Sequence, residues 1–335
     1  MKKSYKDVKS KVTLIRAALA SHALPADDDQ RRFAFYCDEW LVIQQKKVKE
    51  STYVNYYRII ENHLKPGLGN ILPSDMSELI VHQFTHQLMT VKMLSAKTVK
   101  DILVLLRSIL NFTARQVGVT FSDIQIEYPK NDPGEIRVLS REEQTRFVSF
   151  LLTDMDECRF GVYLALMTGM RIGEICALRW EDISLADRMI SVRSTMQRIK
   201  NLDGTSKTKV VIGSPKSAKS MRTIPLTDTV AALCTQICPD NHTAYLLTGT
   251  NDYMEPRRLQ YQMAKYAAAC NLEGVHFHTL RHSFATRCVE VGFEIKCLSE
   301  ILGHASTSVT LERYVHSSLE LKRKNMQKLS DVGMG

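Results

Sequence analysis

Apolar residues in the first third of the chain recur every three or four positions, the spacing of a helix with one buried face. The pattern predicts four helices, over residues 33–45, 51–64, 76–89 and 95–118. Ser51 is placed to cap the second helix and Pro66–Gly67 to stop it, while Gly118 marks the end of the fourth. We therefore expect a helical region over about residues 31–118.

The periodicity changes between Arg188 and Leu226, where short runs favour strands. We predict three of them, over residues 189–194, 208–212 and 222–226, with turns at 201–204 and 213–216. Most of the remaining chain has helical spacing. Ser140 and Glu143 form a capping-box pattern that opens a new helix just after Leu139.

Breaks in these patterns divide the chain. Residues 1–30 are a short leader in which 8–19 have helical spacing. Residues 127–138 hold two prolines and a glycine, and few contacts are expected to cross such a stretch, so we predict an interdomain linker there. The length of 335 residues agrees with about two domains.

Composition narrows the class of protein without deciding it. The chain is 44% hydrophobic, enough for real cores, and its net charge of +9 favours a polyanionic partner. Its eight cysteines are expected to be small buried side chains in a reducing cytoplasm rather than a disulfide framework. The apolar runs are too short for a signal peptide or a membrane span, so we expect neither.

Two basic segments lie at the starts of predicted helices. They are ordinary solvated surface or phosphate contacts, because both cations and helix N-termini attract anions. The candidate phosphate-binding residues are Lys46, Lys47, Lys49, Thr52, Lys97 and Lys100, and they become candidates for DNA contact only through the motifs described below.

Candidate chemistry is concentrated in four short stretches of the second half. They supply two guanidiniums, an ammonium, two imidazoles and a phenol, an inventory that suits in-line attack on a phosphodiester. The stretches are Thr168–Arg171, Lys216 within 214–217, His278–His282, and Leu302–His304 followed ten residues later by Tyr314.

Each residue also has an ordinary structural explanation. Arg171 alone would be a surface arginine, Lys216 a loop lysine, and Tyr314 a core tyrosine, since most tyrosines fill cores or interfaces. His278 and Arg281 share a helical face at i and i+3, whereas His282 points elsewhere and is interpreted as structural. The histidine and cysteine spacing fits no usual zinc pattern, so we expect no metal.

Taken together, these stretches resemble a tyrosine recombinase of the phage or conjugative-transposon integrase kind. The resemblance is most specific at Leu164–Glu174, His278–Thr286 and Leu302–Tyr314. It spans roughly residues 139–320, with a looser similarity to the family's helical core-binding domain over about 30–118. Many integrases carry an additional arm-site domain at the N-terminal end, but thirty residues are too few for an ordinary independent domain, so we do not expect one in residues 1–30.

The resemblance implies a fold and a domain plan. We expect a two-domain, mainly α-helical DNA clamp with a small antiparallel β-sheet in an α+β catalytic domain. The expected parts are a leader (1–30), a helical core DNA-binding domain (31–126), a linker (127–138), a catalytic domain (139–320) and a C-terminal tail (321–335).

The resemblance also implies the chemistry. Tyr314 attacks a DNA phosphate to form a 3′-phosphotyrosyl link, and Lys216, with Lys219 as a substitute, protonates the leaving 5′ oxygen. Glu174 supports Arg171 without doing chemistry. The residues that hold or protonate the phosphate are Arg171, His278, Arg281 and His304.

The implied partners are double-stranded recombination sites, three further copies of the chain in a tetramer on DNA, and an accessory DNA-bending or excisionase protein. We expect no cofactor, no membrane partner and a cytoplasmic, nucleoid-associated protein. Two rival functions stay open: a monomeric DNA-relaxing enzyme of the type IB topoisomerase class, and a DNA-binding protein with a degenerate site.

Overall fold

The computed structural model describes residues 31–130, 136–204, 206–215, 220–314 and 326–327. They fall into two compact units. The first unit holds the described residues before position 135 together with Ile199–Lys209, and the second unit holds the others. The leader, the predicted helix over 8–19 and nearly all of the tail over 321–335 lie outside the described residues.

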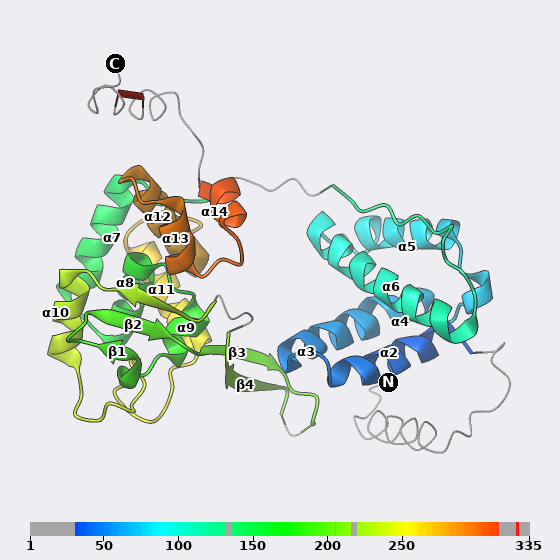
Figure 1. The fold of residues 1–335 in the computed structure, drawn as a ribbon, viewed down its shortest axis with the longest axis horizontal. Helices are drawn as coiled ribbons and strands as arrows, with labels where there is room; N and C mark the ends of the chain where they lie inside the picture. Colours follow the sequence, from blue (N-terminus) through cyan, green and yellow to red (C-terminus); the bar gives the residue numbers. More distant parts are fainter. Residues whose placement is uncertain (1–30, 131–135, 205, 216–219, 315–325, 328–335) are drawn as a thin grey trace. The chain divides into compact units, whose positions relative to one another are not determined.

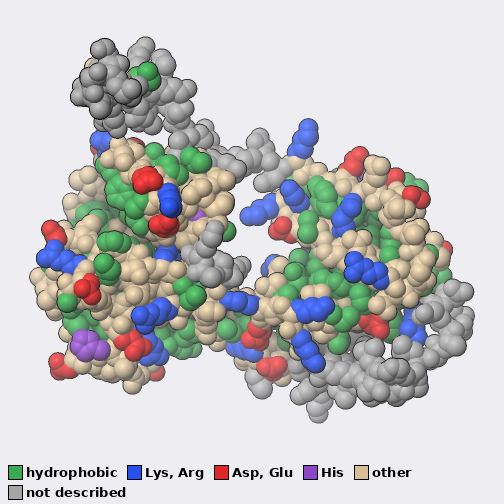
Figure 2. Space-filling view, in the orientation of Figure 1, with side chains coloured by type: hydrophobic (Ala, Val, Ile, Leu, Met, Phe, Trp, Pro, Cys, Tyr) green, Lys and Arg blue, Asp and Glu red, His purple; other side chains and the backbone are tan. Residues whose placement is uncertain are grey.

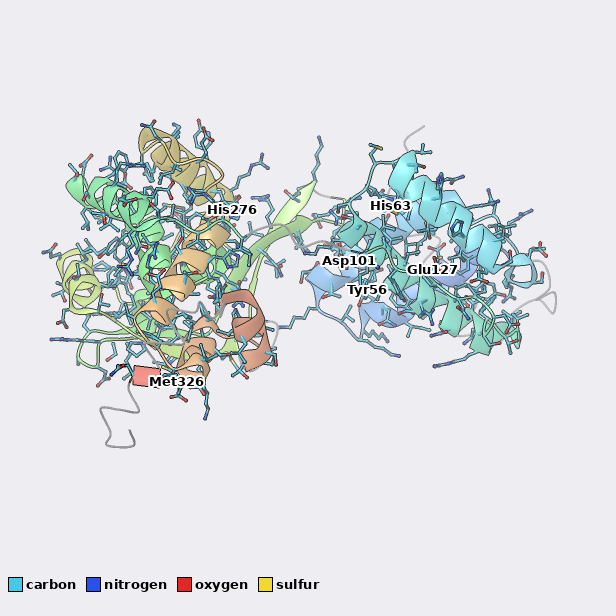
Figure 3. The ribbon with its side chains drawn as sticks, turned by 90° about the horizontal axis from the view of Figure 1, so that it is seen from above. Tyr56, His63, Asp101, Glu127, His276 and Met326 are labelled. Carbon is cyan, nitrogen blue, oxygen red and sulfur yellow. The ribbon has the colours of Figure 1, made fainter. Side chains whose placement is uncertain are left out.

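The first unit is a bundle of helices (Figure 1). Helix α2 packs against α3, α4 and α6, and α5 packs against α6. Trp40 on α2 meets Tyr56 on α3 with ring centroids 5.1 Å apart, and Tyr56 is labelled in Figure 3. The elements are α2 (Phe33–Gln45), α3 (Glu50–Ile59), the π-helical turn η2 (Ile60–Leu64), α4 (Lys65–Leu68), the 3₁₀ turn η3 (Pro73–Asp75), α5 (Glu78–Thr90) and α6 (Ala96–Val117).

Helix α6 forms as its sequence predicts. Ser95 is the N-cap, and its hydroxyl accepts a hydrogen bond from the backbone N–H of Thr98 at 3.3 Å. Gly118 ends the helix in the left-handed conformation at φ 73°, which favours glycine. The buried face of α6 is the apolar stripe of the sequence, so the predicted fourth helix is confirmed.

The second predicted helix differs at both ends. It begins at Glu50 with Lys49 as N-cap, so Ser51 is not the cap. Pro66–Gly67 does not stop the chain's helical course, because Pro66 lies in the first turn of α4, where its missing N–H is not needed. Gly67 serves packing instead: a Cβ there would lie 2.5 Å from the Phe84 ring of α5.

The second unit surrounds the buried helix α8, which packs against α7, α9, α11 and α12 (Figure 1). Helices α13 and α14 complete one side by packing against α12 and each other. The helical elements are α7 (Arg141–Thr153), α8 (Glu157–Thr168), α9 (Ile172–Ala177), the 3₁₀ turn η4 (Trp180–Asp182), α10 (Asp228–Ile237), α11 (Pro256–Ala269), α12 (Phe277–Glu290), α13 (Ile295–Leu302) and α14 (Thr307–Tyr314).

Two small sheets accompany the helices. Strands β1, β2 and β5 form an antiparallel sheet in which Ile190 pairs with Ile183 on one side and Ile224 on the other. β3 and β4 form a separate pair. The bounds are β1 (Ile183–Ser184), β2 (Met189–Val192), β3 (Thr195–Lys200), β4 (Thr208–Gly213) and β5 (Arg222–Pro225).

The strand predictions hold with one correction. The expected strand over 189–194 ends at Val192, where the chain leaves the first sheet, and the strand β3 that begins at Thr195 was not predicted. The fold class is confirmed as mainly helical with small antiparallel sheets.

Burial agrees with the composition. Six of the eight cysteines are buried, Cys238 is half-buried and Cys297 is exposed. Across the described ranges, no helix combines the length and apolar character that crossing a membrane requires.

Candidate active site

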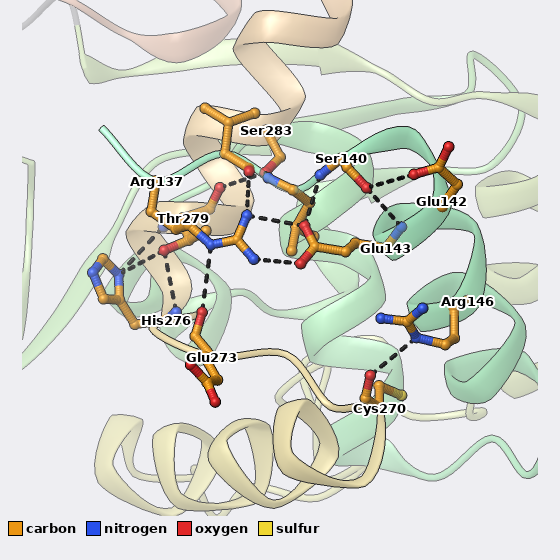
Figure 4. Close-up of polar contacts among 12 residues, drawn as sticks. Arg137, Ser140, Glu142, Glu143, Arg146, Cys270, Glu273, His276, Thr279 and Ser283 are labelled. Atoms are coloured by element: carbon orange, nitrogen blue, oxygen red, sulfur yellow. Dashed lines mark hydrogen bonds and ion pairs between the residues drawn. The ribbon is translucent and has the colours of Figure 1, made fainter. Parts of the chain in front are cut away.

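Polar contacts fix the start of α12 (Figure 4). This helix carries His278, Arg281 and His282 of the third predicted stretch. His276, labelled at the start of α12 in Figure 3, caps it by accepting from the backbone N–H of Thr279 at 3.3 Å. One turn on, the Ser283 hydroxyl accepts from the backbone N–H of Leu139 at 2.8 Å. The Ser140–Glu143 capping box, predicted from the sequence and now confirmed, follows directly in α7. These contacts hold α12 in a set position against the start of α7.

Arg281 on α12 is 5% exposed. Hydrogen bonds to two backbone carbonyls orient its guanidinium. One nitrogen donates to the carbonyl of Gly169 at 2.6 Å and the other to that of Leu302 at 2.6 Å. These carbonyls close α8 and α13, where helix C-termini carry partial negative charge. Burial, reinforced by the charge of Arg171, lowers the pKa of Arg281 to about 9. The site therefore favours an anion beside this guanidinium.

Arg171 is held by Glu174, as the sequence suggested. Arg171 is the N-cap of α9, and Glu174 accepts from its backbone N–H at 2.9 Å and from its side chain at 2.8 Å. The Arg171 side chain stays 37% exposed, whereas Glu174 is 2% exposed. The short turn after Gly169 thus points one guanidinium outward and anchors it on a buried carboxylate.

Arg222 is a residue that the sequence analysis missed. It begins β5, its side chain is 5% exposed, and it donates to the two oxygens of Glu174 at 3.1 and 2.8 Å. It also donates to the Ile301 carbonyl on α13. Its only sequence signal is its position in the basic run that follows Lys216. Arg222 ties β5, α9 and α13 together through one side chain.

Burial raises the pKa of Glu174, but the hydrogen bonds and charge of Arg222, with the charge of Arg171, outweigh it and leave the pKa below its usual value. Glu174 is therefore an anion at neutral pH. A buried anion between two guanidiniums fixes their spacing and offsets their mutual repulsion.

The glycine before His304 gives a test of this packing. Gly303 ends α13 at φ +66°, and an added Cβ would lie 3.0 Å from the Arg222 side chain, which its hydrogen bonds prevent from moving. We expect Gly303→Ala to destabilise the protein by strain of about 1–2 kcal/mol and by at least about 1 kcal/mol more from overpacking. Gly274→Ala is the matched control, since Gly274 has φ +65° and open space around it. Urea unfolding measures the loss in free energy of unfolding for both variants. Equal losses would mean that the Arg222 side chain moves aside without an energetic cost.

Tyr314 is the last residue of α14 and is 6% exposed. Its ring packs among Ala285, Cys288, Leu298 and Leu302. Its hydroxyl lies 2.7 Å from Nδ1 of His282, and its ring stacks with the His304 imidazole at a centroid distance of 6.3 Å.

One histidine prediction needs correction. His282 does not point away from the site. It follows Arg281 directly on α12, and its side chain is directed toward Tyr314 at the end of α14. His304 lies in the connection between α13 and α14, and its Nδ1 is 2.7 Å from the Thr310 hydroxyl. The sequence offered no signal for the first contact, since it joins residues 32 positions apart.

The predicted catalytic residues have different outcomes. Contacts link Arg171 to Glu174 and stack His304 on Tyr314, and the charges of Arg171, Glu174 and Tyr314 all act on buried Arg281. His278 is exposed, with its ring 6.3 Å from that of His282. Lys216 and Lys219 lie outside the described residues. The roles of all these residues stay predictions.

The candidate DNA-binding lysines belong to the first unit, whose surface carries many lysine and arginine side chains (Figure 2). Thr52 is half-buried at the start of α3. The five lysines are exposed: Lys46, Lys47, Lys49, Lys97 and Lys100. Within the described part of the chain, no three histidine, cysteine or acidic side chains are grouped to hold a metal ion.

The fold and this site define a class of protein. The profile of the Phage integrase family matches residues 137–320, and that of the phage integrase N-terminal SAM-like domain matches residues 32–89. The first of these covers more than half of the chain. The chain belongs to the phage integrase family of tyrosine recombinases.

Individual relatives agree with this assignment. The chain is 27% identical over 187 residues to a "Tyrosine recombinase XerC-like" of Caldanaerobacter subterraneus subsp. tengcongensis, covering 50% of this chain and 48% of that protein. It is 24% identical to the "Integrase" of Staphylococcus phage L54a, covering 88% of this chain and 91% of that protein. The chain thus spans about half of the first relative and most of the second.

Solved structures show the same fold. The Tn1549 transposon integrase in complex with a circular intermediate DNA superimposes with a TM-score of 0.74 at 20% identity, covering 89% of this chain and all of that one. A lambda integrase tetramer bound to a Holliday junction superimposes with a TM-score of 0.62 at 16% identity, covering 94% and 88%.

Proposed function

We propose that this protein is a site-specific DNA recombinase that cuts and rejoins DNA through a tyrosine. The observation that carries the proposal is the Tyr314 hydroxyl beside His282 and His304, near the buried cation of Arg281. A phenol with an ordinary pKa of about 10 needs such surroundings to attack at neutral pH. Membership of the phage integrase family supports the assignment.

In the proposed step the Tyr314 oxygen attacks a DNA phosphorus, and the bond from phosphorus to the 5′ oxygen breaks. The phenol gives up its proton and the leaving 5′ oxygen takes one, so a 3′-phosphotyrosyl bond replaces the phosphodiester. Arg171 and Arg281 hold the non-bridging oxygens, and His278 and His304 hold or protonate the phosphate. A 5′-hydroxyl of a partner duplex reverses the step.

The partners in this proposal are double-stranded recombination sites and three further copies of the chain. The solved lambda integrase tetramer on a Holliday junction has the same fold and supports a tetramer. The helical domain over 31–126 contacts phosphates through the six residues named above. An accessory DNA-bending or excisionase protein and a cytoplasmic, nucleoid-bound location complete the proposal.

Lys216 is proposed as the general acid. We expect Lys216→Ala to slow cleavage by about 100-fold or more on an ordinary substrate. A 5′-bridging sulfur leaves without protonation, so such a substrate is expected to restore cleavage, measured as the rate of covalent adduct formation. Lys219→Ala is the matched comparison, and the same loss and sulfur rescue in that variant instead would assign the acid role to Lys219, the substitute. Equal defects of Lys216→Ala on both substrates would move the acid role elsewhere.

The proposal is tested by covalent capture. A nicked suicide duplex carries the junction sequence between the DNA around this gene and the flanking DNA. After cleavage, the short fragment that bears the freed 5′-hydroxyl diffuses away, so the strand cannot be rejoined. The protein is expected to form a DNA adduct that survives a denaturing gel. A protein that binds this duplex but forms no adduct would be the DNA-binding rival, and relaxation of any supercoiled plasmid by a monomer would favour the topoisomerase rival.

A further inference from the structure

We propose that His282 is the base that accepts the proton of Tyr314 during DNA cleavage. The residue was not among the catalytic candidates of the sequence, and the inference rests on the proposed cleavage by Tyr314. Its Nδ1 is 2.7 Å from the Tyr314 hydroxyl, a normal O–H to nitrogen hydrogen-bond length, and it contacts the reacting atom itself.

The geometry distinguishes His282 from the neighbouring imidazoles. The His304 ring is parallel to the Tyr314 ring to within 5° at a centroid distance of 6.3 Å, and its Nδ1 is engaged by the Thr310 hydroxyl. His278 is exposed, one helical turn earlier on α12. Among the contacts described for the Tyr314 hydroxyl, the one with His282 has the length and atom types of a proton transfer.

The surroundings of Tyr314 favour loss of its proton as it attacks. Tyr314 is 6% exposed, so the residue as a whole is largely shielded from water. The electrostatic interaction between Tyr314 and Arg281 means that a cation stabilises the phenolate as it forms. In the step, the Tyr314 O–H bond breaks, the proton moves to Nδ1, and the oxygen forms its bond to phosphorus. In the reverse step the imidazolium returns the proton to the departing phenol.

Packing of α12 also fixes the position of the His282 side chain. His282 lies on the same helix as Arg281, and that helix is pinned by Ser283 and His276. The base, the phosphate-binding cation and the start of the helix therefore move together. Among the described residues, the ionisable groups next to the pair are His278 and Arg281 on α12, Cys288 in the packed cluster, and His304 before α14.

The test uses His282→Asn, because the asparagine amide places a polar atom near the position of Nδ1 but cannot take a proton. With the nicked suicide duplex at pH 7, we expect cleavage about 100-fold slower or more. His276→Asn is the matched control: it removes a histidine from the same helix, keeps a good N-cap, and is expected to cleave normally. Wild-type cleavage by His282→Asn would overturn the proposal.

Two further readouts separate proton transfer from positioning. The unassisted phenolate fraction rises tenfold per pH unit below a phenol pKa of about 10, so the deficit of His282→Asn is expected to shrink from pH 7 to 9. A fluorinated tyrosine of lower pKa at position 314 is expected to reduce the deficit in the same way. A deficit that is unchanged by pH and by fluorination would make His282 only a positioning residue and overturn the proposal.

The wild-type protein separates this inference from the proposed function. If it forms no adduct with the duplex, the proposed function fails and the inference fails with it. If it forms an adduct and His282→Asn does so equally fast, the inference alone fails.

Discussion

Tyr314→Phe is expected to abolish covalent adduct formation while DNA binding and the fold remain. The change deletes one oxygen, and the ring keeps its packing against Leu298, Leu302 and their neighbours. The lost hydrogen bond to His282 costs only about 1 kcal/mol of stability. The measurements are a denaturing gel after incubation with the suicide duplex, and a gel shift for binding.

Tyr261→Phe is the control for this prediction. Tyr261 is 61% exposed on α11, and its hydroxyl is expected to have no part in cleavage. An undiminished adduct with Tyr314→Phe would show that another residue is the nucleophile. Loss of DNA binding by this variant would show that the hydroxyl holds the fold or the DNA rather than attacking it.

Arg222→Met is expected to destabilise the second unit by about 3–5 kcal/mol. It leaves Glu174, which is 2% exposed, as a buried carboxylate with Arg171 as its remaining partner. Arg198→Met is the matched control: it breaks an ion pair with Glu255 whose side chains are 37% and 38% exposed, and it is expected to cost less than about 1 kcal/mol. Urea unfolding at pH 7 measures both losses.

The pH dependence of this loss follows from the lowered pKa of Glu174. A lowered carboxyl pKa contributes stability above the ordinary value of about 4.3 and loses it as the pH falls below that value. The gap between Arg222→Met and the wild type is therefore largest at neutral pH and shrinks in acid. Adding Glu174→Gln to Arg222→Met removes both charges and is expected to recover part of the loss. A gap that is constant with pH would contradict the ion-pair explanation.

The local pattern of the chain was enough for α2, α5 and α6 and for the start of α7. Ser95 and Gly118 bound α6, and the Ser140–Glu143 box opens α7, because capping depends on residues only a few positions apart. The pattern was less accurate where contacts between helices determine the role of a residue. Gly67 predicted a helix stop, but its small size serves the approach of the Phe84 ring from another helix.

The candidate site divides in the same way. The sequence by itself determined which chemical groups are present and the pairing of Arg171 with Glu174, which are three residues apart on one turn. Only the tertiary structure decided that Arg222 completes the buried network and that His282 meets Tyr314, because these contacts join residues 48 and 32 positions apart. Such distances are set by how helices pack, and no local periodicity encodes them.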